Sequence, residues 1–316
     1  MLIETRALTK HFRIGSHQIL HAVDGITLSI QENEILGLVG ESGSGKSTFG
    51  KTLVGLYDRT SGEAFYNGVP LPAKFKSKDH LTYSREMQMI FQDPYSSLNP
   101  RMTVLDIIGE GLVLPGTHSR SEIHEKVAYW LEKVGLHPDH MSRYPHEFSG
   151  GQRQRIGIAR AMIIEPRFVV CDEPISALDV SVQAQIINLL DELKESIGLT
   201  LLFIAHDLSM VRYVSHRMAV MYLGTLVEIG PSNELFFDPQ HPYTQLLIES
   251  NPEPDPVLER SRPHTPIKGE ITSPINVKPG CRFVDRCPRA MAHCSHETPE
   301  FIATSKDRYV ACHLFS

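Results

Sequence analysis

The feature that most constrains this chain is a glycine-rich loop at residues 40–47, with the sequence GESGSGKS. It matches G-x-x-x-x-G-K-[S/T], follows the apolar run EILGLV and precedes the helical pattern TFGKTLVGL. In such a loop backbone N–H groups surround phosphate oxygens, Lys46 neutralises the β and γ phosphates, and the Ser47 hydroxyl can ligate Mg²⁺. The sequence therefore predicts a nucleoside triphosphate site between a strand and a helix. Its candidate residues are Gly40, Glu41, Ser42, Gly43, Ser44, Gly45, Lys46, Ser47 and Thr48.

Composition narrows the class of protein around this loop. The chain has 316 residues, 41% of them hydrophobic, and a formal net charge of -6, which describes a folded globular protein without a basic field for nucleic acid. No apolar run reaches the roughly 18 residues needed to cross a bilayer, since the best one, Leu199–Ala205, has the length of a strand. The N-terminal residues lack the pattern of an export signal, so we expect a cytoplasmic chain without a membrane span of its own.

Alternating apolar runs and helical patterns predict an α/β fold. The runs EILGLVG, FVVCDEP and TLLFIAH are typical of buried strands in a parallel sheet. The segments ITLSI and AFYNG alternate as antiparallel strands do, which adds a small β-layer. Between residues 92 and 149 helical patterns dominate, and the clearest of them, residues 119–136, is expected to end at Gly135. We interpret residues 92–149 as an inserted helical subdomain.

The C-terminal part differs in composition from the rest. Nine prolines fall between Pro239 and Pro279, so this stretch is expected to be extended or irregular. It leads into a small module that holds four of the five cysteines. We therefore expect a nucleotide-binding domain at residues 1–230 and a C-terminal extension at residues 231–316.

Two carboxylates follow one of the buried strands. Asp172 and Glu173 come directly after FVVC, at the edge of the sheet where α/β proteins bind ligands. In phosphoryl transfer one acid holds Mg²⁺, and another group orients or deprotonates the attacking water. We assign Asp172 to magnesium and Glu173 to the water. Cys171 is interpreted as a small core side chain.

With these residues the sequence resembles the ATP-binding subunits of ABC transporters over most of its length. The segment FSGGQ at residues 148–152 is similar to the LSGGQ signature of that family, with Phe148 in place of leucine. A helical pattern follows it, so its backbone amides and the Ser149 hydroxyl can form a second anion site. The resemblance implies a P-loop NTPase fold of the ABC type, ATP as substrate, and nucleotide contacts from Ser149, Gly150, Gly151 and Gln152.

The resemblance also assigns a magnesium site. Gln92, which follows the strand-like QMIF, corresponds to the Q-loop glutamine that contacts Mg²⁺ and water and relays state to the membrane subunits. The implied magnesium ligands are therefore Ser47, Gln92 and Asp172.

Three further positions match elements of the family. Residues 176–179 match the D-loop, which implies a nucleotide contact from Asp179. His206 corresponds to the switch histidine at the γ-phosphate, and Phe12 lies where an aromatic ring stacks on adenine. The implied catalytic residues are Glu173, His206 and Gln92.

A signature far from its own phosphate loop implies, by resemblance, a head-to-tail dimer. Each ATP then lies between the loop of one subunit and the signature of the other. ATP closes the dimer, and hydrolysis reopens it. The catalytic set on this chain is complete, so its own site is expected to hydrolyse ATP.

The segment HPYTQLL, from His241 to Leu247, narrows the family further. It resembles the His-Pro-Tyr segment that opens the extension of oligopeptide and dipeptide importer ATPases, most closely the second ATPase of dipeptide importers. The phrases FQDPYSSLNPRMTV and DEPISALDVSVQAQI are similar to the same subfamily. Importers of nickel, opines, glutathione or antimicrobial peptides share these phrases, so such cargoes stay open.

The resemblance implies an assembly at the inner face of the cell membrane. Its parts are a second, homologous ATPase that forms a heterodimer with this chain, two transmembrane permease subunits and an external peptide-binding protein. The chain itself is then peripheral to the membrane through the permeases. A soluble ABC protein that acts in DNA repair or translation is the alternative, and a single ATPase unit without a long heptad segment disfavours it.

The four C-terminal cysteines are spaced C-x5-C-x6-C-x17-C. Zinc sites usually use tighter C-x2-4-C pairs, and Cys287-Pro288 is weakly similar to ferredoxin runs. The resemblance implies a 4Fe-4S cluster, while zinc or free thiols stay open. In a Pro-rich tail with little core, such a site is expected to be structural, with redox sensing as the alternative. The candidate ligands are Cys281, Cys287, Cys294 and Cys312.

Overall fold

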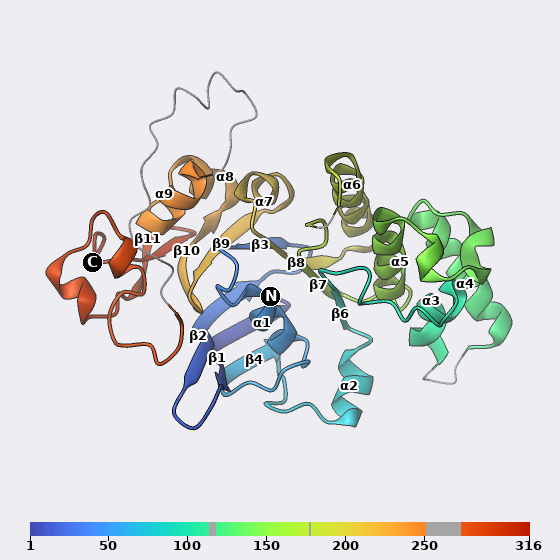
Figure 1. The fold of residues 1–316 in the computed structure, drawn as a ribbon, viewed down its shortest axis with the longest axis horizontal. Coiled ribbons are helices and arrows are strands. Elements are labelled where there is room, and N and C mark those ends of the chain that lie inside the picture. Colours follow the sequence, from blue (N-terminus) through green and yellow to red (C-terminus); the bar gives the residue numbers. More distant parts are fainter. Residues whose placement is uncertain (114–117, 177, 251–272) are drawn as a thin grey trace, which may run out of the picture. The chain divides into compact units, whose positions relative to one another are not determined.

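The structure, a computed structural model, describes residues 1–113, 118–176, 178–250 and 273–316. The chain forms two compact units, one made of Met1–Lys74 with Phe203–Ser316 and the other of Phe75–Leu202 (Figure 1). Both units combine strands and helices, so the predicted α/β class is confirmed. The predicted division at residue 230 and the range of the helical subdomain stay predictions.

The first unit contains a four-stranded antiparallel sheet with the order β2-β1-β4-β5. The central strand β1 pairs with both neighbours, which places Ile3 opposite Ile30 and Tyr66. The segments ITLSI and AFYNG fall in β2 and at β4, so the predicted antiparallel layer is present. The strands are β1 (Ile3–Arg13), β2 (Ile19–Ile30), β4 (Ser61–Tyr66) and β5 (Val69–Pro70).

A second sheet of the first unit carries the phosphate loop. Strand β3 (Ile35–Val39) is buried along its whole length and runs parallel to β9 (Arg217–Tyr222). Strand β10 (Thr225–Pro231) then pairs antiparallel with β9. Helix α1 (Lys46–Leu53) begins at the end of the loop, and α7 (Leu208–Val214) packs against β3. The buried strand β8, Thr200–Ala205, contains the point in the sequence where one unit ends and the other begins.

The second unit combines a parallel strand pair with a group of helices. Met87 of β6 pairs with Phe168 of β7, and Trp130 lies buried in α4. Helix α3 packs against α4 and α5, so α5 also belongs to this helical group. The elements are β6 (Met87–Ile90), β7 (Phe168–Asp172), α2 (Ser77–Tyr83), α3 (Val104–Val113), α4 (Arg120–Lys133), α5 (Gly150–Met162) and α6 (Val180–Ile197), with 3-10 turns η1 (Pro138–Ser142) and η2 (Pro145–Glu147).

Helix α4 shows why its sequence forms a helix of this length. Ser119 and Glu122 make a reciprocal capping box at the N-terminus, which satisfies two backbone N–H groups that have no partner in the helix. Gly135 has φ 73°, the left-handed conformation that ends helices and favours glycine. The predicted end of this helix at Gly135 is confirmed.

The C-terminal extension is more regular than its prolines suggested. Helix α9 (Pro242–Glu249) lies inside the stretch that was expected to be extended or irregular, so that expectation is wrong there. Pro242 occupies the first turn, where a missing N–H costs nothing, and the His241 Nδ1 accepts a hydrogen bond from the Tyr243 N–H at 3.0 Å. Helix α8 (Ser232–Phe237) precedes α9. Residues 251–272 of the same stretch lie outside the described residues.

The end of the chain adds strands to the sheet that carries the phosphate loop. Strand β12 (Arg308–Ala311) pairs antiparallel with β10, and β11 (Phe301–Ser305) pairs with β12. Sequence analysis did not predict this extension of the sheet. Along the chain the 3-10 turns η3 (Val284–Arg286) and η4 (Ala292–Ser295) come between α9 and β11, and they carry part of the cysteine module, residues 281–312.

A buried polar network holds the start of α9 against β10. Glu228 is fully buried and accepts hydrogen bonds at 2.9 Å from the backbone N–H groups of Gln240 and His241. Arg308 of β12 lies 3.3 Å from the same carboxylate and 2.9 Å from that of Asp238. These partners satisfy a carboxylate that would otherwise be costly to bury.

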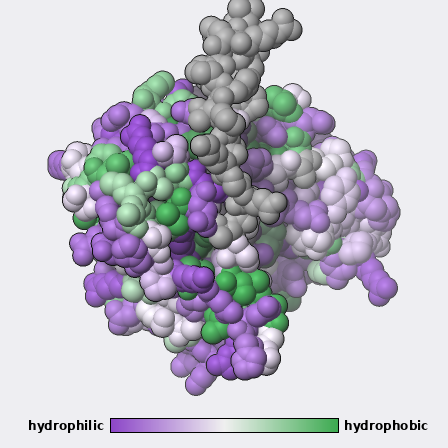
Figure 2. All heavy atoms as spheres, turned by 60° about the vertical axis from the view of Figure 1, so that its left-hand side comes forward, coloured by the Kyte–Doolittle hydropathy of each residue, from purple (hydrophilic) through white to green (hydrophobic). Residues whose placement is uncertain are grey.

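The hydropathy of the helices and of one face of the molecule bears on whether the chain has a segment suited to a membrane. Among the described residues no helix combines the length and the hydropathy that a membrane span requires. Figure 2 shows one face of the molecule, on which small groups of hydrophobic residues are interspersed with hydrophilic ones.

The burial of His241 predicts a dependence of stability on pH. The His241 side chain is 1% exposed, and burial lowers its pKa to about 3. Between pH 7 and pH 5 the unfolded chain binds a proton at this histidine and the folded chain does not, so the free energy of unfolding falls as the pH falls. At about 1.4 kcal/mol per pKa unit, the wild type should lose about 2 kcal/mol more over this range than His241→Asn, which keeps an acceptor for the helix N-terminus.

Urea denaturation at pH 7 and pH 5 checks this expectation. The matched control is His124→Asn, which changes an exposed histidine of α4 and should leave the wild-type pH dependence intact. Equal losses for the wild type and His241→Asn would contradict the assignment.

Candidate functional site

The phosphate loop begins where β3 ends and closes at the N-terminus of α1. Gly45 caps α1 with φ 102°, and a Cβ there would lie 1.9 Å from the carbonyl oxygen of Ala22 in β2. A Cβ on Gly40 would lie 2.1 Å from the carbonyl oxygen of Met221 in β9. The approach of these two strand backbones therefore requires glycine at both positions. The loop presents its amides at the start of a helix, a geometry that favours anions.

Lys46 places a buried positive charge in the same loop. Its side chain is 4% exposed, and its Nζ donates to the carbonyl oxygens of Gly40 at 2.7 Å and Glu41 at 2.9 Å. Nζ also lies 3.3 Å from the Ser44 hydroxyl. The predicted residues 40–48 all lie in this loop and the first turn of α1. An ammonium beside a helix N-terminus suits a polyphosphate.

Glu41 has partners that sequence analysis missed. Its backbone N–H donates to the Tyr243 hydroxyl, and its carboxylate pairs with Arg286. These partners lie 202 and 245 positions away along the chain, so no local pattern carries the signal.

Phe12 lies near the end of β1. Its ring meets that of Tyr57 edge to face, with ring centroids 5.4 Å apart, and the Lys10 ammonium lies 4.7 Å from its centroid. These contacts fix the ring, and its stacking on adenine stays a prediction.

The two carboxylates lie at the end of β7 in the second unit. Asp172 is 2% exposed, while Glu173 has φ 45°, a backbone conformation that side-chain-bearing residues rarely adopt. The Gln92 Nε2 donates to the Glu173 Oε2 at 2.9 Å, which joins two of the predicted catalytic residues. Cys171 is fully buried, and this burial raises its pKa, as expected for a core thiol.

The signature segment forms the N-terminus of α5. Ser149 is the N-cap: its hydroxyl accepts from the Gln152 N–H at 3.3 Å, and the Gln152 Oε1 accepts from the Ser149 N–H at 3.0 Å. This capping box fixes the helix start and engages the Ser149 hydroxyl and the Gln152 side chain within the protein, so the nucleotide contacts of the signature stay predictions. A Cβ on Gly151 would lie 2.5 Å from a methyl group of Val182, so the signature packs closely against α6.

The D-loop and the switch histidine follow buried strands. Asp179 occupies the N-cap position of α6, and its carbonyl oxygen accepts from the N–H groups of Val182 and Gln183, both at 2.9 Å. Ala177 of the D-loop lies outside the described residues. His206 is exposed and comes directly after β8. The nucleotide contacts of Asp179 and His206 stay predictions.

The structure brings the four C-terminal cysteines to one small cavity. All four line a cavity of about 10 Å³, and none of them forms a disulfide. Burial, together with the neighbouring thiols, raises the pKa of Cys281 to about 11. The convergence expected from the sequence is therefore present, with Cys281, Cys287, Cys294 and Cys312 around one centre.

Two histidines that sequence analysis did not single out accompany these thiols. Donor atoms of His293, Cys294 and His313 lie within 4.8 Å of one another. Both histidines directly neighbour a cysteine in the sequence, in AHC and in CHL, which is the signal that could have found them. Among the described residues no three of the four thiols all lie within 4.8 Å of one another.

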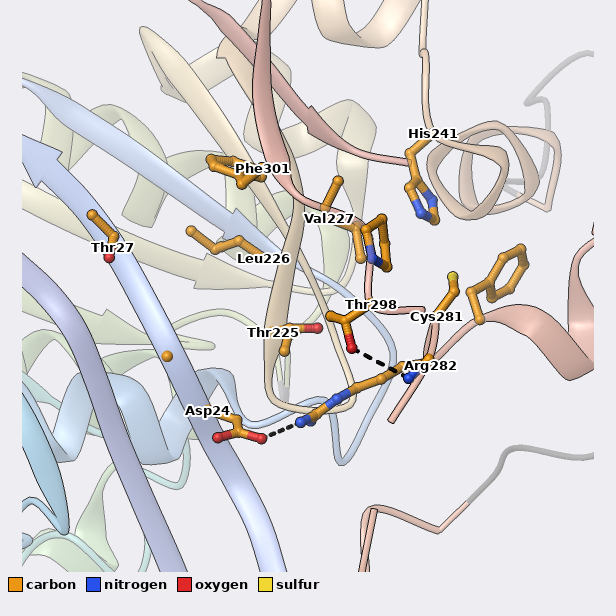
Figure 3. Close-up of a pocket in the computed structure, with 15 residues that line it drawn as sticks. Asp24, Thr27, Thr225, Leu226, Val227, His241, Cys281, Arg282, Thr298 and Phe301 are labelled. Carbon is orange, nitrogen blue, oxygen red and sulfur yellow. Dashed lines mark hydrogen bonds and ion pairs between the residues drawn. The ribbon is translucent and has the colours of Figure 1, made fainter. Parts of the chain in front are cut away.

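A larger pocket of about 270 Å³ lies beside the cysteine module (Figure 3). His11 and His21 approach the Asp24 carboxylate at its edge, each at 3.1 Å, which resembles a metal site. Arg282 pairs with the same carboxylate, as Figure 3 shows, and its positive charge disfavours a divalent cation there.

Two protein families match this chain, one over the nucleotide-binding region and one over the C-terminal extension. Residues 23–176 match the family described as ABC transporter. Residues 227–294 match the family described as oligopeptide/dipeptide transporter, C-terminal region. The second match includes the His241 segment and three of the four cysteines, Cys281, Cys287 and Cys294.

Relatives match over almost the whole chain. The chain is 53% identical to a putative oligopeptide transport ATP-binding protein, YkfD of Bacillus subtilis, over 99% of this chain and 95% of that protein. It is 48% identical to the oligopeptide transport ATP-binding protein OppF of Escherichia coli, over 95% and 92% of the two chains.

Solved structures show the same fold. The ATP-binding cassette MJ0796, in a dimeric post-hydrolysis state with ADP and Pi, matches with a TM-score of 0.67 and 27% identity, over 73% of this chain and 99% of that one. The cassette cbiO1 of Clostridium perfringens matches with a TM-score of 0.66 and 26% identity, over 75% and 91%. The loop geometry, the fold and these relatives together show that the chain belongs to the ATP-hydrolysing ATP-binding proteins of ABC transporters, in the group with the oligopeptide/dipeptide C-terminal region.

Proposed function

We propose that this chain is the ATP-hydrolysing subunit of an ABC importer that energises the uptake of peptides across the cytoplasmic membrane. The observation that carries the proposal is the presence, in one chain, of a nucleotide-binding cassette and a C-terminal region of the oligopeptide/dipeptide transporter type. The relatives quoted above are named for oligopeptide transport, which supports peptide cargo. A preference for dipeptides is a finer part of the proposal.

The phosphate loop supplies the binding part of the chemistry. Its amides and the Lys46 ammonium would hold the phosphates, and the Ser47 hydroxyl would ligate Mg²⁺. Asp172 would contribute a carboxylate to this ion, for which hard oxygen ligands are preferred. When bound, Mg²⁺ neutralises charge that develops on the transferred phosphoryl group.

Glu173 acts on the attacking water in this proposal. Its φ of 45° and the 2.9 Å hydrogen bond from the Gln92 amide fix the direction of its carboxylate. A carboxylate held in this way can orient the water and accept its proton. The Gln92 contact also links the state of this carboxylate to the Q-loop, whose glutamine we propose to contact Mg²⁺ and to respond to the permease.

Glu173→Gln should keep nucleotide binding and remove hydrolysis. The amide retains the size and one acceptor of the carboxylate but cannot take the proton, so turnover should fall on the order of 100-fold or more. Binding of ATP should stay within about threefold, and the closed ATP-bound dimer should accumulate. The measurements are the steady-state ATPase rate and size-exclusion chromatography with ATP.

The matched control for this prediction is Lys46→Ala, which should weaken ATP binding itself. An unchanged ATPase rate in Glu173→Gln would show that this glutamate does not carry the reaction.

The partners follow from the same proposal. We infer a head-to-tail dimer with a second, homologous ATPase, in which Ser149, Gly150, Gly151, Gln152 and Asp179 serve the nucleotide of the partner. The dimeric state of the similar cassette MJ0796 supports this arrangement. Two permease subunits and an external peptide-binding protein complete the importer. The chain is then peripheral, at the cytoplasmic face of the membrane.

We further propose that the four cysteines hold a 4Fe-4S cluster with a structural role. Four sulfur donors around one cavity are the ligand set of Fe–S clusters and of zinc. A tetrahedral Zn–S₄ site brings all four sulfurs to about 3.8 Å from one another, whereas among the described residues no three of these thiols all lie within 4.8 Å of one another, which favours a cluster. The cavity of about 10 Å³ holds about one water-sized sphere, which by itself favours a single ion. Zinc is therefore the alternative.

Metal analysis of anaerobically purified protein distinguishes these ligands. A cluster predicts about four iron and four sulfide per chain with broad absorption near roughly 400 nm, and Cys294→Ser should lower all three together with thermal stability. Cys171→Ala is the matched control, because Cys171 lies in β7, and it should keep the full metal content. One zinc per chain would support the alternative, and a chain with neither metal would overturn the site.

Uptake of labelled peptides tests the cargo. Cells that carry Lys46→Ala as the only copy should lose uptake of dipeptides or of longer peptides, and the length that is lost sets the preference. A wild-type copy is the control. Unchanged uptake of every peptide would instead support nickel, glutathione, an opine or an antimicrobial peptide as the cargo. A chain that stays in the soluble fraction without any permease would favour the non-transport alternative.

A further inference from the structure

The side chain of Arg286, a residue of the cysteine module, contacts the phosphate loop. It directly precedes Cys287, and its Nη1 and Nη2 lie 2.7 Å and 2.8 Å from the two carboxylate oxygens of Glu41. Its Nη1 also lies 3.4 Å from the Tyr222 hydroxyl. The Arg286 side chain is 3% exposed and that of Glu41 is 22% exposed. A two-pronged pair of this kind fixes both the place and the orientation of the carboxylate.

A second contact from the C-terminal extension holds the backbone of Glu41. The Glu41 N–H donates to the Tyr243 hydroxyl at 2.9 Å. Tyr243 is fully buried, and its ring centroid lies 4.5 Å from that of Tyr222 and 5.4 Å from that of Phe283. Phe283 and Arg286 belong to the same short segment, so both contacts depend on the docking of that segment.

The third group of Glu41 faces the loop itself. Its carbonyl oxygen accepts a hydrogen bond from the Lys46 Nζ at 2.9 Å. Glu41 is therefore held by its N–H, its carboxylate and its carbonyl oxygen. Glu41 therefore links the C-terminal extension to Lys46, the lysine that we propose to bind phosphate.

The negative charge of Glu41 affects how strongly the loop can bind a triphosphate. A carboxylate in a loop that binds a triphosphate repels the ligand, because like charges at short range disfavour each other. Arg286 is an arginine, which keeps its charge at every physiological pH, and it cancels this negative charge directly. Without Arg286, the loop would present an uncompensated negative charge beside Lys46.

We propose that Arg286 is a positioning residue for the phosphate loop, which acts through Glu41 to set the affinity of the loop for ATP. Arg282 strengthens the docking of the same segment, since it pairs with Asp24 of β2 (Figure 3) and donates to the carbonyl oxygen of Leu223. The proposal rests on nucleotide binding by the loop and is independent of the ligand of the cysteines. It gives the C-terminal extension a part in nucleotide binding that acts through Glu41.

A set of variants at the two residues tests this role in the full chain. Arg286→Met keeps the aliphatic stem and exposes the charge of Glu41, so the Kd for a fluorescent ATP analogue should rise about tenfold. Glu41→Gln removes the negative charge and leaves the positive charge of Arg286 unopposed beside the loop, so the Kd for the analogue should fall below that of the wild type. The double variant carries neither charge and should return to within about threefold of the wild type, because the charge that Arg286 neutralises is then gone.

The kinetics should separate positioning from a loss of folded protein. In Arg286→Met the KM for ATP should rise by the same factor as the Kd, with kcat within about threefold, whereas misfolding lowers the active fraction and therefore kcat. Arg289→Met, an exposed arginine of the same module, is the matched control and should bind ATP as the wild type does.

Two results would overturn the inference. One is wild-type affinity in Arg286→Met, and the other is a double variant that stays as weak as Arg286→Met. If Arg286→Met does not fold, Arg286→Gln replaces it: this variant also removes the positive charge, so its Kd should rise about tenfold, and wild-type affinity would contradict the proposal. Failure of the wild type to bind the analogue would count against the nucleotide function itself, which is a different result.

Discussion

The phosphate loop can adopt its shape only because two strand backbones approach it with no side chain between. Gly45 lies against Ala22 of β2, and Gly40 lies against Met221 of β9, at distances that exclude any Cβ. This contact places the start of α1 and the buried ammonium of Lys46 where an anion can meet both. It also requires that segments from both ends of the sequence come together, since β9 begins only at Arg217. The conformation of the loop thus depends on strands from two distant parts of the sequence, both of which belong to the first unit.

The C-terminal extension is attached to that unit mainly through backbone pairing and buried polar contacts. Strand β12 continues the sheet next to β10, and the carboxylate of Glu228 joins Arg308 to the start of α9. Such groups add little when paired, but removing one partner leaves a buried charge that is strongly destabilising. The attachment is thus specific, because any other docking position would leave these charges unpaired. This specificity gives Arg286 a defined position from which to reach Glu41.

Local signals in the sequence predicted the parts of the site that are local in space. The strand, loop and helix around Lys46 span about 20 residues, and the position of Asp172 and Glu173 follows from one buried strand. The contact between Gln92 and Glu173 joins residues 81 positions apart, and only the resemblance to a family suggested that both act together. The contacts of Glu41 and the two C-terminal strands depend on pairing between distant segments, for which a single sequence holds no periodic signal. The many prolines of the surrounding stretch mask helix α9, which contains only one of them, Pro242, at the first helical position, where proline is well tolerated.

Glu173 has a strained backbone conformation that its well-ordered surroundings maintain. A positive φ in a residue with a side chain costs on the order of 1–3 kcal/mol, and it persists only where the neighbours fix the backbone. Here β7 is buried along its whole length up to Asp172, and the Gln92 amide donates a hydrogen bond to the Glu173 carboxylate. The strand thus fixes the backbone and Gln92 fixes the side chain, so the carboxylate needs little reorganisation before it meets a water molecule. A group arranged in advance in this way is suited to a step in which one proton moves at a defined place.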